Sequence, residues 1–144
     1  MEISFWSSGV PPLIYQARTL TTPIIDPSNN IYMVAGAYAA NVSTNDAWMS
    51  SDLGSTWVCQ SCLNTDPSKV FTPRDSAGFG ADQAGTLYMI GGIEDTDGPE
   101  QHAPEMWNST DQGVTWNLMT NAGPWNLQAE DGAPFILFDS SDNM

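Results

Sequence analysis

The chain has 144 residues, of which 41% are hydrophobic, and this composition predicts one folded domain rather than a disordered segment. Three basic residues face seventeen acidic ones, so the formal net charge at pH 7 is −14. A surface this negative repels phosphate backbones and anionic lipid headgroups, which argues against nucleic acids and membrane surfaces as partners. The sequence also has no apolar run of eighteen residues, the length of a membrane-spanning helix.

The first complete unit, residues 18–73, predicts four short strands. Each is rich in β-branched or aromatic residues and is bounded by Asp, Pro, Asn or Gly turn signals. The predicted strands are residues 19–25, 31–36, 47–50 and 56–59. No segment has a convincing apolar period of 3.6 residues, so we expect helices to be scarce.

The second unit, residues 74–130, repeats the first. Residues 31–36 (IYMVAG) recur 56 positions later as LYMIGG, and residues 47–57 recur 59 positions later. Upstream, Arg18 matches Arg74 at the offset of 56. Four antiparallel strands repeated about every fifty-odd residues predict an all-β fold made of β-propeller blades.

Both ends of the chain match parts of a unit. Residues 139–144 align with residues 26–31, and residues 1–17 resemble the tail of a preceding unit. We therefore expect residues 1–17 to end one blade and residues 131–144 to supply the first strand of another, within one propeller domain. Because a propeller needs four to eight blades, we expect a fragment of a larger ring.

A short motif follows the third predicted strand of each unit. Its residues are Ser50, Asp52, Gly54 and Trp57 in the first unit, and Ser109, Asp111, Gly113 and Trp116 in the second. The motif resembles the Asp-box repeat of sialidases and other secreted propellers, and the Tyr-x-x-Gly-Gly strand resembles that of kelch propellers. The resemblance implies an Asp that accepts N–H bonds across a turn, a left-handed Gly and a Trp in the core.

The resemblance to sialidases also implies which residues catalysis would require. A sialidase needs an arginine triad, a nucleophilic Tyr with a Glu, and a separate acid, whereas Arg18 and Arg74 are the only arginines and share one repeat position. We expect both arginines to tie the first strand of their unit to a neighbouring loop. The sole histidine, His102, has no nucleophile motif beside it, and we expect it in a solvated loop.

We therefore expect no catalytic residue in this stretch and predict a non-catalytic extracellular module. Its role would be structural, adhesive, or the binding of a glycan or an extracellular protein, with a homo-oligomer or fibre if the chain is complete. The alternative is part of a secreted propeller enzyme, either a sialidase-like glycosidase or a kelch-type oxidase, whose catalytic residues lie elsewhere.

Further residues favour an extracellular protein. Asn41 and Asn108 each begin an N-glycosylation sequon, and Cys59 and Cys62 are spaced for a small disulfide-closed turn. A redox or zinc role for the cysteines is the alternative, although no second Cys pair is present.

Two features of the second unit leave alternatives open. Asp95, Asp97 and Glu100 surround Gly98 in a pattern like the first half of a calcium loop, or they form a solvated acidic loop. No other cofactor is expected. Trp125, outside the repeated Trp positions, either fills the gap between blades or contacts a ligand.

Overall fold

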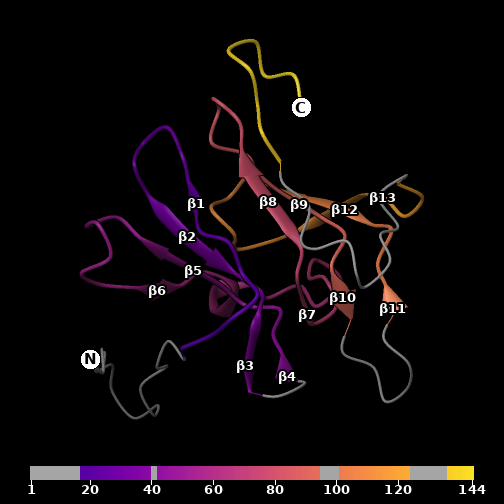
Figure 1. Cartoon of the computed structure of the whole chain (residues 1–144). Coiled ribbons are helices and arrows are strands. Elements are labelled where there is room, and N and C mark those ends of the chain that lie inside the picture. Colours follow the sequence, from indigo (N-terminus) through magenta and orange to yellow (C-terminus); the bar gives the residue numbers. More distant parts are fainter. Residues whose placement is uncertain (1–16, 40–41, 95–100, 124–135) are drawn as a thin grey trace.

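The computed structural model describes residues 17–39, 42–94, 101–123 and 136–144 (Figure 1). Its strands form antiparallel sheets of two to four strands, which confirms the all-β expectation. The described helical content is one 3-10 helix, η1 (Ser61–Leu63). No helix in the described ranges is long and apolar enough to cross a membrane.

Each unit builds one four-stranded sheet. The first sheet has the order β1-β2-β5-β6, with β1 (Ile24–Ile25), β2 (Ile31–Val34), β5 (Ala47–Ser50) and β6 (Val58–Cys59). The second sheet contains β8 (Gly78–Ala81), β9 (Leu87–Ile90), β12 (Met106–Ser109) and β13 (Asn117–Thr120), which neighbour one another in that order. The strands occur where the sequence predicts them, but β1 is much shorter than the predicted residues 19–25.

Each large sheet has further short strands at one end. This end is opposite the β1–β2 turn in the first sheet and opposite the β8–β9 turn in the second. β3 (Ala37–Ala39) pairs with β4 (Val42–Ser43). In the second unit β10 (Ile93–Glu94) pairs with both β7 (Arg74–Asp75) and β11 (Gln101–His102). The expectation that His102 lies in a solvated loop is therefore wrong, because it lies on β11 opposite Ile93 and is partly buried.

One five-residue turn occurs three times. Each begins with an Asp whose Oδ1 accepts two backbone N–H groups, from the residues two and four positions later. These bonds join Asp26 to Ser28 and Asn30, Asp82 to Ala84 and Thr86, and Asp139 to Ser141 and Asn143, over 2.7–3.0 Å. The residue three places after each Asp has positive φ: Asn29, Gly85 and Asp142. The third turn thus repeats the first two, as the sequence alignment predicts.

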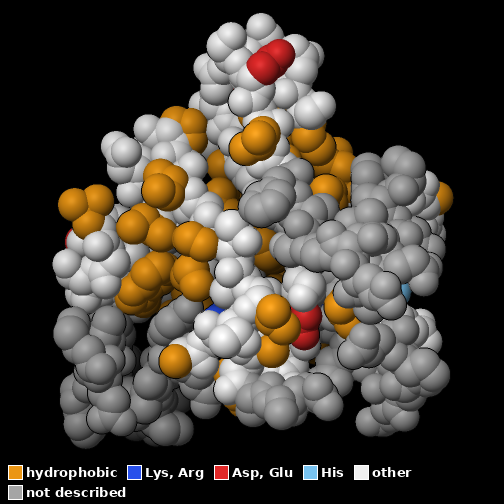
Figure 2. Space-filling view, viewed as in Figure 1, with side chains coloured by type: hydrophobic (Ala, Val, Ile, Leu, Met, Phe, Trp, Pro, Cys, Tyr) orange, Lys and Arg blue, Asp and Glu red, His pale blue; other side chains and the backbone are white. Residues whose placement is uncertain are grey.

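Alternating residues give each sheet two faces. On the first sheet Tyr32, Val34, Ala47 and Met49 share what we call the front face, and Ile31, Met33 and Trp48 share the back face. Repeat equivalence assigns Tyr88, Ile90, Met106 and Asn108 to the front of the second sheet, and Leu87, Met89 and Trp107 to its back. Figure 2 shows hydrophobic side chains gathered over β2 and β5.

The two large sheets pack front to back. The main core joins the front of the first sheet, including Tyr32 and Val34, to the back of the second, including Leu87, Met89 and Trp107. Equivalent faces therefore do not meet each other. Two sheets related by a two-fold axis would bury the same face twice, whereas this contact buries opposite faces and can be repeated by a further sheet.

The same relation begins again beyond the second sheet. Ile136 and Phe138 pack on its front face, beside Tyr88, Ile90 and Met106. In the repeat, Ile136 and Phe138 are 57 residues after Phe79 and Ala81, which pack in the same manner against the first sheet. Residues 136–138 therefore contact the front of the second sheet as residues 79–81 contact the front of the first.

Candidate functional site

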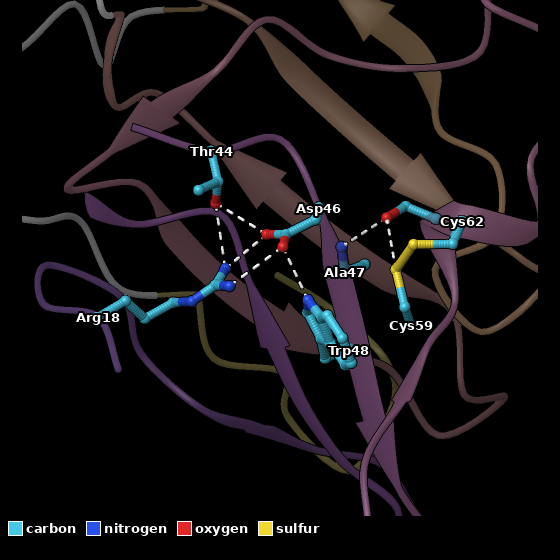
Figure 3. The surroundings of a disulfide bond; sticks show 8 residues. Arg18, Thr44, Asp46, Ala47, Trp48, Cys59 and Cys62 are labelled. Atoms are coloured by element: carbon cyan, nitrogen blue, oxygen red, sulfur yellow. Dashed lines mark hydrogen bonds and ion pairs between the residues drawn. A yellow bond between two sulfur atoms is a disulfide. The ribbon is translucent and has the colours of Figure 1, made fainter. Parts of the chain in front are cut away.

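Arg18 lies in a buried cluster at the end of the first sheet from which the β3–β4 hairpin extends (Figure 3). Its two terminal nitrogens donate to the two carboxylate oxygens of Asp46, over 2.5 and 3.1 Å. Nη1 also donates to the carbonyl of Ala35 and to Oγ1 of Thr44. The indole of Trp48 donates to Asp46 Oδ2 over 2.7 Å. Only 2% of the Arg18 side chain is exposed, so the cluster is an internal ion pair.

Arg74 repeats this cluster in the second unit. Nη2 donates to Glu105 over 2.7 Å and to Glu94 over 2.9 Å, and Nη1 donates to the carbonyl of Gly91. The indole of Trp107 donates to the same carboxylate oxygen of Glu105, as Trp48 does to Asp46. Asp46 and Glu105 are the same repeat position, 59 residues apart. The structural role predicted for both arginines agrees with these contacts, but each arginine ties the segment before the first strand of its large sheet, and not that strand itself, to the residues around its acid partners.

The acid partners of the arginines were missed in the sequence. A signal was present, because an acid stands two residues before each repeated Trp: Asp46 before Trp48 and Glu105 before Trp107. The pattern is obscured because one unit uses Asp and the other Glu. The arginine is 28 residues from its acid in the first unit and 31 in the second.

The charge state of Asp46 follows from its contacts. Burial raises the pKa of this carboxyl. Hydrogen bonds from Arg18, Trp48 and Thr44, together with the charge of Arg18, lower the pKa by more than burial raises it, so the net pKa is below the usual value. Asp46 is therefore ionised at neutral pH and keeps Arg18 neutralised. Every nitrogen of the Arg74 guanidinium is likewise bonded to a protein acceptor, and the residue is fully buried, so it is not presented to a substrate carboxylate.

The two turns whose sequence resembles the Asp-box have matching hydrogen bonds. Asp52 Oδ1 accepts the N–H of Thr56 over 2.8 Å, and Asp111 Oδ1 accepts that of Thr115 over 2.9 Å. The glycine of each motif has positive φ, 86° at Gly54 and 87° at the second. These features agree with the predicted roles of Asp and Gly.

Serine has a role in the turns that the sequence did not predict. Ser50 Oγ accepts the N–H of Gly54 over 2.8 Å and donates to Asp52, and Ser109 Oγ does the same for Gly113 and Asp111. Both serines are almost fully buried. The hydroxyl thus connects the carboxylate to the left-handed glycine.

The two motif tryptophans differ. Trp116 is 1% exposed and packs edge-on against Phe71, with ring centroids 5.3 Å apart, as predicted for a core residue. Trp57 is only half-buried, and its indole donates to the carbonyl of Gly54 in its own turn, so the core prediction is wrong for it. The link between the units covers Trp116, because its Lys69 carbonyl accepts the N–H of Trp116 and its Phe71 ring packs against the indole.

The predicted disulfide joins Cys59, at the end of β6, to Cys62 in η1, with the Cα atoms 5.4 Å apart (Figure 3). The intervening Ser61 accepts the N–H of Ala47 through Oγ over 3.0 Å. The closed turn is therefore fixed to β5.

The remaining predicted residues lie in different places. Asn108 is on β12, an interior strand of the second sheet, and is half-buried. Asn41, Trp125 and the calcium candidates Asp95, Asp97 and Glu100 lie outside the described residues. Within the described ranges, no three His, Cys, Asp or Glu side chains are grouped so that they could hold a metal ion.

The three repeated turns line an open groove of about 340 Å³. Each turn contributes its Asp and the residue before it: Ile25 and Asp26, Ala81 and Asp82, Phe138 and Asp139. The residue after each Asp also lines the groove, and Gln83 is one of these. The groove combines apolar side chains with the three turn carboxylates, of which Asp26 is only 7% exposed and accepts internal hydrogen bonds at both oxygens.

A scan against protein-family models and a search of curated proteins both found no match to this chain. The resemblance to Asp-box and kelch propellers therefore rests on the repeated residues alone.

Proposed function

We propose that the two large sheets are consecutive blades of a β-propeller, and that the chain is a non-catalytic extracellular module that binds a glycan or a protein. The observation that carries the proposal is the front-to-back packing of two sheets with the same strand order. Such packing extends around an axis, which is how blades form a ring. In this ring β1, β8 and residues 136–138 are the innermost strands.

The groove between the repeated turns is the proposed binding surface. In a propeller it lies at the mouth of the central channel, because its lining residues follow the innermost strands. The net charge of −14 favours a ligand with basic groups. The engagement of both arginines in internal ion pairs supports a structural role for them rather than a sialidase role.

A binding screen against a glycan array and basic extracellular proteins tests this function. Gln83→Trp adds bulk at the groove, and Thr110→Trp is the control at an exposed site in the second Asp-box. We expect a ligand whose affinity falls at least tenfold in Gln83→Trp and is unchanged in Thr110→Trp. Equal binding by both variants would place the ligand elsewhere, and the absence of any ligand would contradict the binding role.

An extracellular location is supported by the disulfide, since such bonds persist in oxidising compartments. We expect the protein in the medium of its own cells, with Cys59 and Cys62 resistant to alkylation. Intact mass with and without a reductant makes the measurement. Two alkylated cysteines in protein isolated without reductant would contradict an extracellular location.

A further inference from the structure

The disulfide-closed turn belongs to the first unit and not to the second. Cys59 and Cys62 have Leu118 and Asn121 at the equivalent positions, 59 residues later. The second sheet forms its four strands without a bridge, and β13 continues to Thr120 where the first unit turns into η1. The bridge therefore holds the path that the chain takes after β6, and the four-stranded sheet does not depend on it.

The two cysteines differ in exposure. Cys62 is exposed, whereas Cys59 is 7% exposed and its sulfur lies 3.7 Å from the hydroxyl of Ser61. Exposed disulfides are reduced more readily than buried ones. A disulfide also stabilises a protein less when it closes a short loop, and this one joins residues with a sequence separation of 3. The bond is therefore open to attack by a thiol at Cys62.

The closed turn supports the place where the second unit meets the first (Figure 3). The N–H of Gln60 donates to the carbonyl of Ala47 over 2.8 Å, and the hydroxyl of Ser61 accepts the N–H of Ala47. A Cβ on Gly113 would lie 3.1 Å from Ala47 Cβ and 3.8 Å from Gln60 Cβ. The closed turn and the start of β5 therefore form the surface against which the turn of Gly113 packs.

The segment that leaves the closed turn also binds the second unit. The side chain of Asn64 donates to the carbonyl of Lys69, which accepts the N–H of Trp116 over 2.9 Å. The ammonium of Lys69 donates to Oδ1 of Asn117 over 2.7 Å. Opening the bridge therefore frees the start of a segment that connects β6 to the residues before and at the start of β13.

From these contacts we propose that the disulfide is a redox-active bridge that controls the contact between the two units, with Cys62 as the attacked sulfur. The thiolate of a dithiol reductant forms a mixed disulfide with Cys62, and Cys59 leaves as a thiolate that takes up a proton. The second thiol of the reductant then displaces Cys62, which leaves as a thiol. Two electrons and two protons thus pass from the dithiol to the protein, and the dithiol becomes a disulfide.

Reduction of the native full-length protein tests the redox role. We expect a small dithiol to open the bond at a concentration that leaves the far-ultraviolet circular dichroism unchanged, after which alkylation labels both cysteines. Cys62 in Cys59→Ser should be alkylated at least about tenfold faster than Cys59 in Cys62→Ser, because only Cys62 is exposed. A bond that opens only in denatured protein, or equal reactivity of the two thiols, would overturn the redox role.

Amide hydrogen exchange of the oxidised and reduced protein tests the control of the contact. We expect exchange at Ala47 and Trp116 to become at least about tenfold faster on reduction, while β9, an interior strand of the second sheet, exchanges as before. The double variant Cys59→Ser, Cys62→Ser is the control, and it should exchange like the reduced protein with or without the dithiol. Unchanged exchange at Ala47 and Trp116, or equally faster exchange throughout the second sheet, would overturn the proposal.

Discussion

At the scale of single residues, the turns depend on a few buried hydrogen bonds and left-handed positions. Ser109 is fully buried, and its hydroxyl is the acceptor for the buried N–H of Gly113. Gly92 has a φ of 100°, and a Cβ there would lie 2.9 Å from the carbonyl oxygen of Asp75. Gly36 has the equivalent contact with Thr19 in the first unit.

Ser109→Ala removes the acceptor for the Gly113 N–H. We expect the free energy of unfolding to fall by about 1–3 kcal/mol, the cost of a buried unsatisfied donor. Thr110→Ala is the control, because Thr110 is exposed on the same turn. Urea denaturation measures both. If the two variants have the same midpoint, the serine does not support the turn.

Gly92→Ala should destabilise far more than Gly85→Ala. Both glycines have positive φ, so each substitution incurs about 1 kcal/mol for a left-handed alanine. A Cβ at Gly85 meets no atom within 4 Å, whereas at Gly92 it meets backbone, which adds about 1–3 kcal/mol. Equal denaturant midpoints for the two variants would show that the second unit lacks this close contact.

At the scale of elements, each arginine cluster connects the segment that precedes the first strand of a large sheet to the end of that sheet where the small strands lie. Arg74 is fully buried, and its two carboxylate partners lie on or next to different strands. A buried ion pair that loses one partner leaves an uncompensated charge. The buried arginine is paired with Asp46 in the first unit and with Glu105 in the second.

Arg74→Ala should lower the free energy of unfolding by about 3–5 kcal/mol, because Glu94 and Glu105 lose their cation. Arg74→Lys should recover part of this loss, since an ammonium keeps the charge but not the planar set of donors. Lys69→Ala, which removes a hydrogen bond to Asn117, is the control. If calorimetry finds that Arg74→Ala destabilises the protein no more than Lys69→Ala does, the structural role of Arg74 is contradicted.

Acid should destabilise the first unit through Asp46. Its folded-state pKa is below the usual 3.8, so the ionised pair contributes stability above that pH, and the contribution is lost as the pH falls through the folded value. We expect the free energy of unfolding to decline below about pH 4, less steeply in Asp46→Asn than in the wild type. An identical pH profile for both would exclude Asp46 from the acid response.

The strands and turns could be predicted from sequence because their signals are local. The backbone N–H bonds to Asp26, Asp52 and their equivalents span four residues or fewer. The small hairpins were missed because Val42–Ser43 and Gln101–His102 are two-residue strands without an apolar alternation. Trp57 and Trp116 have the same local motif but different burial, because burial depends on contacts with residues distant in sequence, such as that of Phe71 with Trp116.

At the scale of the whole molecule, the repeat has a direction. The front of one sheet receives the back of the next, and residues 136–138 begin the same contact once more. The repeat could be read from the sequence, but which faces meet could not, because both faces of each sheet carry large apolar residues such as Tyr32 and Met33.

An experimental structure of the native full-length protein, by crystallography or cryo-electron microscopy, tests the stacking most directly. We predict four to eight four-stranded sheets around one axis, with β1, β8 and residues 136–138 innermost and the turns of Asp26, Asp82 and Asp139 around one opening. A structure in which the two large sheets bury equivalent faces, or in which residues 136–138 leave the front of the second sheet, would contradict the propeller.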